Sequence, residues 1–324
     1  MRAEKKSVIL SILLFNSSVL FASFASVKVI YGEDGREDLV HVLNPEFREL
    51  AKSTAAMIPD KKIVELNSEQ INLGGSTLEE GNICSSERFV KQPTAANCSG
   101  FLVGEDILVT AGHCIKGQAD CDSNSWVFDY KVDYATQSEV VVDKKNVYKC
   151  KEVLSRSLDS ATKNDYAVIK LTRKVEDRNV LKMRKSGSPS VGQGLVVIGH
   201  PSGLPTKVTS GAIIRSINKI FMVTNLDTYG GNSGSAVFNS VTGEVEGILV
   251  RGDADYKWDD VQGCRVSNTL GERDGRGEDV TLISVVEGIP EQLEDEETPP
   301  VDVIAPKPSA PAWWLRFLEW LRRR

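Results

Sequence analysis

His113, Asp165 and Ser233 are the residues of this 324-residue sequence most suited to covalent catalysis. A serine hydroxyl becomes a good nucleophile when a neighbouring base removes its proton. Histidine suits that task because its pKa lies near neutrality, and a buried carboxylate can fix its tautomer. Singly, each residue has an ordinary structural explanation, such as a turn or a hairpin loop. Together, in the order His, Asp, Ser, they predict a nucleophilic hydrolase site.

The segments around the three residues strengthen this prediction. They read LVTAGHC up to Cys114, NDYAVI from Asn164 and GGNSGS from Gly230. The glycines beside Ser233 have no Cβ to block a tight turn, so backbone N–H groups can point toward a developing oxyanion.

The elements that must position these residues are short strands. Nine β-branched or apolar runs are separated by Gly, Asn, Asp and Pro, with little long helical pattern between them. This spacing predicts an all-β barrel or sandwich. A short helix is expected over residues 45–57, where apolar residues recur at helical spacing. The runs are 101–103, 107–109, 139–142, 166–171, 195–198, 212–214, 235–238, 245–250 and 280–285.

The N-terminal end is typical of a targeting segment. Positive charges at Arg2, Lys5 and Lys6 precede an apolar run, and small residues at Ser23 and Ala25 match a signal-peptidase site. We therefore expect residues 1–25 to be a cleaved signal peptide and 26–75 a pro-segment or N-terminal extension. The alternative is an uncleaved anchor, although polar residues interrupt the run.

The C-terminal end differs from the globular part, which we expect to span residues 76–290. Residues 291–312 are acidic and proline-rich, which predicts an extended linker. Residues 313–324 combine Trp, Leu and Arg in a pattern typical of an amphipathic helix. This helix would either make peripheral contact with an anionic membrane or dock on a protein surface.

Charge and cysteine content narrow the functional class. The net charge of −6 gives no electrostatic reason to expect nucleic acid as a partner. The six cysteines lack the spacing of a zinc site, so we expect no metal. An even number behind a signal peptide favours disulfides in an oxidising compartment, with 15 possible pairings.

The three motifs together resemble the trypsin/chymotrypsin superfamily, and within it the bacterial V8-like secreted proteases, over about residues 80–290. The resemblance implies an all-β fold of two six-stranded Greek-key β-barrels, with the active site in the cleft between them. It makes His113 the general base, Asp165 its orienting carboxylate and Ser233 the nucleophile. The backbone N–H groups of Gly231 and Ser233 would form the oxyanion hole.

The resemblance also implies disulfides. Cys98 and Cys114 match the pair that braces the histidine loop in family members. The likeliest remaining pairs are then Cys121 with Cys150 and Cys84 with Cys264.

Substrate preference is expected to follow from Asp227. In the family, the residue six positions before the nucleophile lies at the base of the primary specificity pocket, and Asp227 would there pair with a substrate Lys or Arg. Thr228, Val250 and Gly252 would line the same pocket. The alternative is that Asp227 caps a backbone group or pairs with Arg251.

A second alternative is Glu specificity of the V8 type. Those enzymes place a His on the pocket wall, where this sequence has Leu249, and Asp227 would repel an acidic substrate. Arg251 keeps this alternative open because it could bind a carboxylate with two hydrogen bonds.

The sequence departs from the family at two positions near the nucleophile. Val250 replaces a serine that usually hydrogen-bonds the catalytic aspartate, so Asp165 needs other donors. Asn232 replaces the aspartate that receives the new N-terminus of activated trypsins. Lys62 precedes Ile-Val, as at an activation site, so cleavage there is expected to trim a pro-segment without switching activity on.

We therefore expect a secreted or periplasmic serine endopeptidase that cleaves polypeptides after Lys or Arg, with association to a membrane surface as one outcome for the C-terminal helix. It would need no cofactor. The other alternative is a catalytically silent relative that acts as a binding module.

Overall fold

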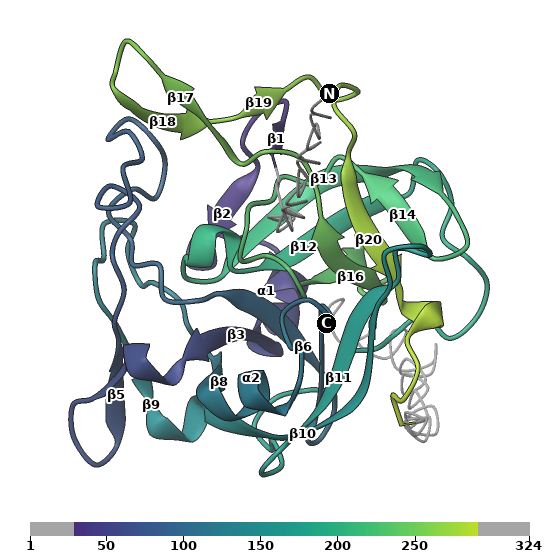
Figure 1. Cartoon of the computed structure of the whole chain (residues 1–324), viewed down its shortest axis with the longest axis horizontal. Helices are drawn as coiled ribbons and strands as arrows, with labels where there is room; N and C mark the ends of the chain where they lie inside the picture. The colour runs from purple at the N-terminus through teal and green to yellow at the C-terminus, as the bar shows by residue number, and fades with distance from the viewer. Residues whose placement is uncertain (1–28, 291–324) are drawn as a thin grey trace, which may run out of the picture. The chain divides into compact units, whose positions relative to one another are not determined.

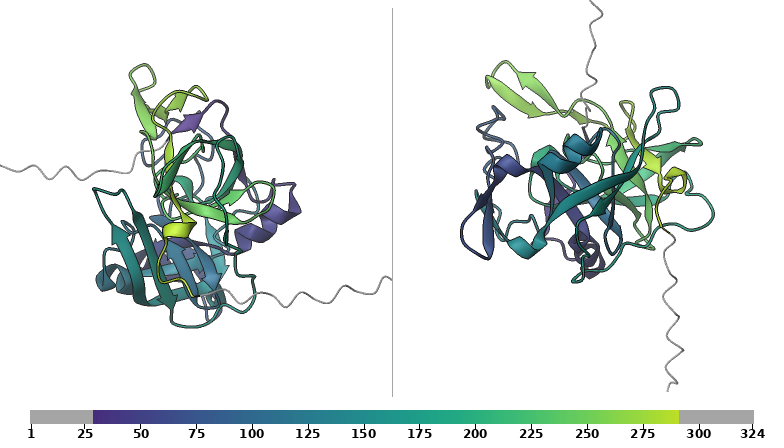
Figure 2. Two further views of the ribbon diagram at one scale, coloured as in Figure 1. Left: turned by 90° about the vertical axis from the view of Figure 1, so that its right-hand side faces the viewer. Right: turned by 60° about the horizontal axis from the view of Figure 1, so that its bottom comes forward.

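The computed structural model describes residues 29–290, and these form two closed β-barrels packed against each other (Figure 1). The views in Figure 2 separate the first barrel, in blue and teal, from the second, in green. The expected signal peptide (1–25), the linker (291–312) and the C-terminal helix (313–324) lie outside the described residues. No helix in residues 29–290 is long and apolar enough to cross a membrane.

The first barrel closes through six strands in the order β10-β11-β7-β6-β3-β8. Antiparallel pairing of β11 with β7 sets Ala167 opposite Thr110, close to the ends of the histidine and aspartate motifs. The barrel strands are β3 (Thr54–Pro59), β6 (Cys98–Gly104), β7 (Ile107–Thr110), β8 (Asn124–Phe128), β10 (Val147–Leu158) and β11 (Asp165–Leu171).

The second barrel closes because β12 pairs with both β15 and β13. Its order is β12-β15-β16-β20-β14-β13, and β2 (Arg36–Asp38) adds a further strand beside β13. The barrel strands are β12 (Gly194–Gly199), β13 (Lys207–Ile217), β14 (Phe221–Thr224), β15 (Ala236–Asn239), β16 (Val245–Arg251) and β20 (Glu278–Leu282). The prediction of two six-stranded barrels is confirmed.

Smaller elements surround the barrels. Helix α1 (Pro45–Lys52) begins at Asn44, whose side chain accepts a hydrogen bond from Glu46 N, and helix α2 is Gln118–Ser123. Three small sheets accompany the barrels in residues 29–290. The first pairs β1 (Ile30–Tyr31) with β19 (Thr269–Leu270), and the second pairs β17 (Tyr256–Asp259) with β18 (Cys264–Ser267). In the third, β5 (Gln70–Leu73) lies between β4 (Ile63–Glu65) and β9 (Val140–Asp143). Four 3₁₀ turns are Asp60–Lys62, Lys144–Asn146, Pro201–Gly203 and Ile283–Val285.

The structure corrects the boundary expected at residue 75. Strand β3 lies between β6 and β8 and is needed to close the first barrel. The helix expected over 45–57 ends at Lys52, and Thr54 to Ile58 are buried strand residues. Cleavage after Lys62 would therefore leave a strand of the first barrel on the N-terminal fragment, and trimming of 26–75 as a pro-segment stays a prediction.

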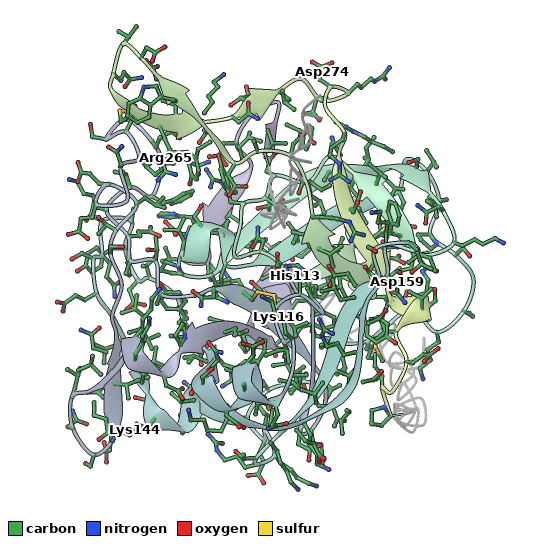
Figure 3. All side chains as sticks on the ribbon, in the orientation of Figure 1. His113, Lys116, Lys144, Asp159, Arg265 and Asp274 are labelled. Carbon is green, nitrogen blue, oxygen red and sulfur yellow. A yellow bond between two sulfur atoms is a disulfide. The ribbon has the colours of Figure 1, made fainter. Side chains whose placement is uncertain are left out.

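One apolar core joins the two barrels. Phe101 and Trp126 of the first barrel and Phe238 and Val250 of the second belong to the same cluster of buried side chains. The loops that carry His113 and Ser233 are therefore held by a shared, close-packed interior. Figure 3 shows His113 near the middle of the molecule, while Arg265 lies on the peripheral β17–β18 hairpin.

Candidate active site

His113 and Asp165 come together at one end of the first barrel. Strand β7 ends at Thr110 and leads into the His113 turn, while β11 begins at Asp165. His113 Nδ1 lies 2.9 Å from Asp165 Oδ2, and His113 N donates to Asp165 Oδ1 at 3.1 Å. With Nδ1–H as the donor, the imidazole keeps Nε2 as an acceptor. This is the tautomer that a general base requires.

Close packing and a disulfide shape the histidine turn. A Cβ on Gly112 would overlap the carbonyl oxygen of Ser157, so only glycine fits there. The Cys98–Cys114 disulfide ties the residue after His113 to strand β6. The other two disulfides, Cys121–Cys150 and Cys84–Cys264, are also the pairs that the resemblance implied.

Arg251 is the additional partner of Asp165 that the sequence analysis missed. Its Nη1 lies 3.8 Å from Asp165 Oδ2, and Asp165 is 3% exposed. Val250, the neighbour of Arg251, is fully buried and has no side-chain donor. The guanidinium of Arg251 therefore lies close to a carboxylate that the serine of other family members would hydrogen-bond.

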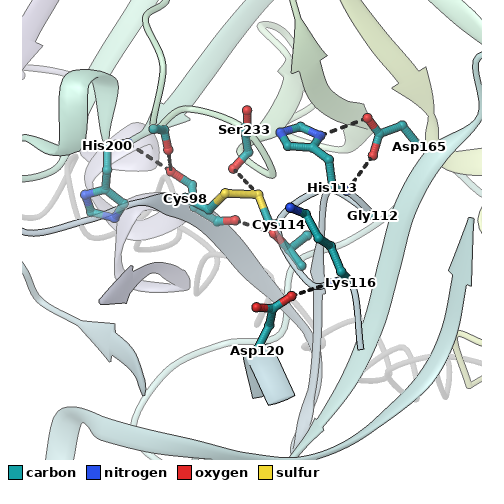
Figure 4. Close-up of a disulfide and its surroundings, with 12 residues drawn as sticks. Cys98, Gly112, His113, Cys114, Lys116, Asp120, Asp165, His200 and Ser233 are labelled. Atoms are coloured by element: carbon teal, nitrogen blue, oxygen red, sulfur yellow. Dashed lines mark hydrogen bonds and ion pairs between the residues drawn. A yellow bond between two sulfur atoms is a disulfide. The ribbon is translucent and has the colours of Figure 1, made fainter. Parts of the chain in front are cut away.

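Ser233 lies on the loop between β14 and β15, between two glycines with positive φ. Gly231 has φ 94° and Gly234 has φ 87°, and a Cβ on Gly234 would overlap Ser99 O. Figure 4 shows Ser233, His113 and Asp165 in that order, with the histidine ring in the middle. The loop is fixed from the first barrel, because Ser99 N donates to Ser233 O at 2.8 Å.

No hydrogen bond joins Ser233 Oγ to the His113 ring among residues 29–290. Catalytic hydrogen bonds are often long before substrate binds and shorten in the complex. The order of the three side chains is that of a nucleophile, base and orienting carboxylate.

The backbone N–H groups of Gly231 and Ser233 have no acceptor within the described part of the chain. The turn is held instead by its neighbours, since Asn232 N donates to Tyr229 O at 3.0 Å and Gly234 N donates to Leu249 O at 2.8 Å. Asn232 is buried with Ser235 Oγ beside its amide oxygen. The loop therefore keeps its shape while two donors remain available to a ligand oxygen.

Asp227 occupies a different environment from the one expected. Its two carboxylate oxygens accept hydrogen bonds from Tyr31 N at 2.7 Å and Gly35 N at 2.8 Å. Burial nevertheless raises the pKa of Asp227 to about 6. The carboxylate thus caps the backbone of the N-terminal segment, which was the alternative considered for it.

A second buried carboxylate, Glu278, lies beside two of the expected pocket positions. Thr228 Oγ1 donates to Glu278 Oε2 at 2.7 Å, and a Cβ on Gly252 would overlap both carboxylate oxygens. Glu278 begins strand β20 and is fully buried. Sequence reasoning missed it because Glu278 lies 45 positions after Ser233 in a segment without a motif (278 − 233).

The groups considered for Glu specificity are engaged elsewhere. Leu249 is fully buried. Arg251 Nε donates to Asp279 Oδ2 at 2.8 Å, and its Nη2 donates to Lys163 O at 2.6 Å. Two of the guanidinium nitrogens therefore already donate to protein acceptors.

His200 is the other histidine near the site, and it is fully buried. Its Nδ1 lies 3.1 Å from Leu204 O and its ring stacks on Tyr130 with centroids 5.6 Å apart. Burial lowers the pKa of His200 to about 3, so the ring stays neutral. Cys98, His113 and Cys114 also approach one another, but both cysteines are consumed by their disulfide and offer no thiolate to a metal.

Comparison with known proteins shows a similarity over about half of the chain. Residues 98–248 match the model of the trypsin-like peptidase domain. Two curated relatives are named probable periplasmic serine endoprotease DegP-like. The one from Hahella chejuensis is 33% identical over 165 residues, covering 48% of this chain and 30% of the relative. The one from Pseudomonas fluorescens is 38% identical over 158 residues, covering 46% of this chain and 28% of the relative.

The chain therefore spans about a third or less of the length of these relatives. A solved Glu endopeptidase in complex with MPD is 15% identical with a TM-score of 0.46, covering 91% of this chain and all of that one. The matched domain contains His113, Asp165 and Ser233. Residues 98–248 of this chain are therefore similar to the trypsin-like peptidase domain of serine endoproteases.

Proposed function

We propose that this protein is an endopeptidase that cleaves polypeptides through an acyl-enzyme, with Ser233 as nucleophile, His113 as base and Asp165 as orienting carboxylate. The observation that carries the proposal is the pair of hydrogen bonds from His113 to Asp165, which holds Nε2 as an acceptor next to Ser233. This arrangement is the one that serine hydrolysis requires.

In the first half-reaction, His113 Nε2 takes the proton of Ser233 as Oγ attacks the substrate carbonyl carbon. The carbonyl oxygen becomes an oxyanion and accepts hydrogen bonds from the N–H groups of Gly231 and Ser233. Collapse of this intermediate breaks the C–N bond, and the imidazolium returns the proton to the leaving amine. Water then repeats the sequence on the acyl-enzyme and releases Ser233.

Asp165 remains ionised throughout and stabilises the imidazolium. Arg251, 3.8 Å away, places a positive charge beside this buried carboxylate. Arg251 thereby takes over part of the role of the serine that Val250 replaces.

We propose cleavage after Lys or Arg. The buried carboxylate of Glu278 lies against two of the expected pocket residues, and a cationic substrate side chain is its natural complement. The engagement of Arg251 by Asp279, Asp165 and Lys163 O disfavours the Glu-specific alternative.

We propose a secreted or periplasmic location. The names of the DegP-like relatives describe periplasmic enzymes, and three disulfides suit an oxidising compartment. Peripheral membrane contact through residues 313–324 is a further proposal, testable by co-sedimentation of the full chain with anionic vesicles.

The decisive experiment labels the purified full chain with a fluorophosphonate and measures cleavage of a peptide library. We expect wild type to be labelled and active, and Ser233→Ala to lose both. A wild-type protein that is neither labelled nor active would instead favour the silent binding module. Preference for Glu over Lys and Arg would favour the V8-type alternative while leaving the triad in place.

A further inference from the structure

The two buried carboxylates near Thr228 have different partners. Asp227 precedes Thr228 in sequence, and its oxygens accept from backbone N–H groups of the segment 31–35. Glu278 comes from strand β20 and accepts from the Thr228 hydroxyl at 2.7 Å and from Asp253 N at 3.3 Å. The two acids are therefore held by different segments of the chain.

Glu278 contacts two residues that are expected to line the specificity pocket. Thr228 and Gly252 are two of the residues that the family resemblance places in the specificity pocket. The carboxylate of Glu278 contacts both, because it accepts from Thr228 Oγ1 and lies against Gly252 where a Cβ would overlap it. A glycine at 252 is the residue that leaves room for this carboxylate.

The segment whose backbone donates to Asp227 is itself held in place. Gly32 N donates to Leu270 O in the sheet of β1 and β19, and Thr228 N donates to Val29 O. Both carboxylate oxygens of Asp227 thus already serve backbone donors of this segment, and the side chain has a structural role there.

We infer that Glu278, and not Asp227, is the carboxylate that binds the cationic side chain of the residue before the scissile bond. This inference rests on the proposed function and names the residue that determines its specificity. An ammonium or guanidinium entering between Thr228 and Gly252 forms a charge-assisted hydrogen bond with Glu278 in a site shielded from water. Asp227 acts as a structural cap for the N-terminal segment.

The test compares Glu278→Gln with the matched control Asp227→Asn in the full chain. Each variant loses one carboxylate charge and keeps its size. The measured quantity is the ratio of kcat/KM for a peptide with Lys before the scissile bond to that for the same peptide with norleucine, its uncharged analogue. We expect Glu278→Gln to lower this ratio by roughly 100-fold or more, because removal of one partner from a buried ion pair has a cost of that order. We expect Asp227→Asn to change it by less than about threefold.

Labelling of Ser233 by a fluorophosphonate separates this inference from the proposed function. If wild type is not labelled, the proposed function fails before specificity is measured. If wild type is labelled and cleaves but Glu278→Gln keeps its Lys preference, or Asp227→Asn loses it, the assignment of Glu278 is overturned and the triad stands. A labelled wild type without a preference for basic residues also overturns it.

Glu278→Asp keeps the test valid should Glu278→Gln fail to fold. The shorter side chain withdraws the carboxylate by one methylene, so we expect the preference for basic residues to persist while the Arg:Lys ratio of kcat/KM rises at least threefold. An unchanged Arg:Lys ratio would contradict direct contact between this carboxylate and the substrate side chain.

Discussion

The turns that carry His113 and His200 place the same side chain in opposite environments. His113 follows strand β7, its side chain is 27% exposed, and its Nδ1 faces the carboxylate of Asp165. His200 follows strand β12, is fully buried, and faces the carbonyl oxygen of Leu204. A carboxylate partner and partial exposure allow an imidazole to take up a proton, whereas a neutral partner and full burial oppose it.

The comparison shows that a histidine near an active site is assigned by its partners rather than by its position in a motif. Of these two histidines, His113 faces a carboxylate and His200 a carbonyl oxygen, so His113 is the one that suits the proposed role of base and acid. His200 instead supports the loop that faces Gly231, because a Cβ on Gly231 would contact His200 O. The predictions below test this division of roles.

The largest effect is expected for His113→Ala. Without the base, kcat/KM should fall on the order of 10⁴- to 10⁶-fold. The midpoint of thermal unfolding should change little, because the ring is partly exposed. Peptide hydrolysis and calorimetry measure the two quantities. Activity above about one hundredth of wild type would show that another group removes the Ser233 proton.

Asp165→Asn should reduce kcat/KM on the order of 10⁴-fold at neutral pH. The amide no longer stabilises an imidazolium and permits the wrong histidine tautomer. The matched control is Asp159→Asn on the exposed turn before β11, where the same chemical change should have less than a threefold effect. Similar losses in both variants would argue against a specific role for Asp165.

His200 should make the fold sensitive to acid. Its pKa is lowered from 6.5 to about 3, so the unfolded chain binds more protons below pH 6.5. The free energy of unfolding should therefore decrease as pH falls from 6.5 toward 3, by up to about 1.4 kcal/mol per pH unit from this group.

His200→Phe keeps a buried ring and removes this titration. We expect the variant to have a lower free energy of unfolding than wild type at pH 7, since the hydrogen bond to Leu204 O is lost. As the pH falls, its free energy of unfolding should decrease less steeply than that of wild type. Urea denaturation at several pH values measures both. An identical decline in wild type and variant would show that His200 does not titrate in the unfolding transition.

The smallest effect is expected for Asp227→Asn. The contribution of Asp227 to the free energy of unfolding changes with pH in the direction opposite to that of His200. The pKa of Asp227 is raised from 3.8 to about 6, so the folded chain binds the extra proton between these values. The stability from this group is complete below pH 3.8 and is lost as pH rises through 6. The total is about 3 kcal/mol for two pKa units.

The asparagine variant should lack this rise in stability on acidification, measured by the same denaturation series. Because His200 and Asp227 act in opposite directions, His200→Phe and Asp227→Asn should change the dependence of the free energy of unfolding on pH in opposite ways. Parallel profiles for Asp227→Asn and wild type would contradict titration of Asp227 between pH 4 and 6.

The sequence predicted much of the fold because most barrel strands have strong local patterns. Each of the nine runs identified from β-branched and apolar residues overlaps a strand in the structure, although residues 283–285 of the last run form a 3₁₀ turn. Strand β3 was missed because its Thr-Ala-Ala-Met-Ile sequence resembles the end of the preceding helix. It is a strand because it hydrogen-bonds to β6 and β8, and those partners are distant in sequence.

Strand β10 was missed for a different reason. Over Val147–Leu158 buried and exposed residues alternate irregularly, with two register shifts against β11. Bulges of this kind break the two-residue period on which strand prediction depends. The polar strand β2 likewise acquires its conformation from its pairing with β13.

For the site, the sequence by itself determined the candidate nucleophile, base and carboxylate, because their motifs are local and their chemistry depends on residue type. Tertiary structure alone decided which further charged groups join them. Arg251 reaches Asp165 across 86 positions (251 − 165), and Glu278 reaches Thr228 across 50. The hydrogen bonds from Tyr31 and Gly35 to Asp227 span more than 190 positions. Partners so far apart leave no spacing to detect, because barrel closure rather than local chain geometry brings them together.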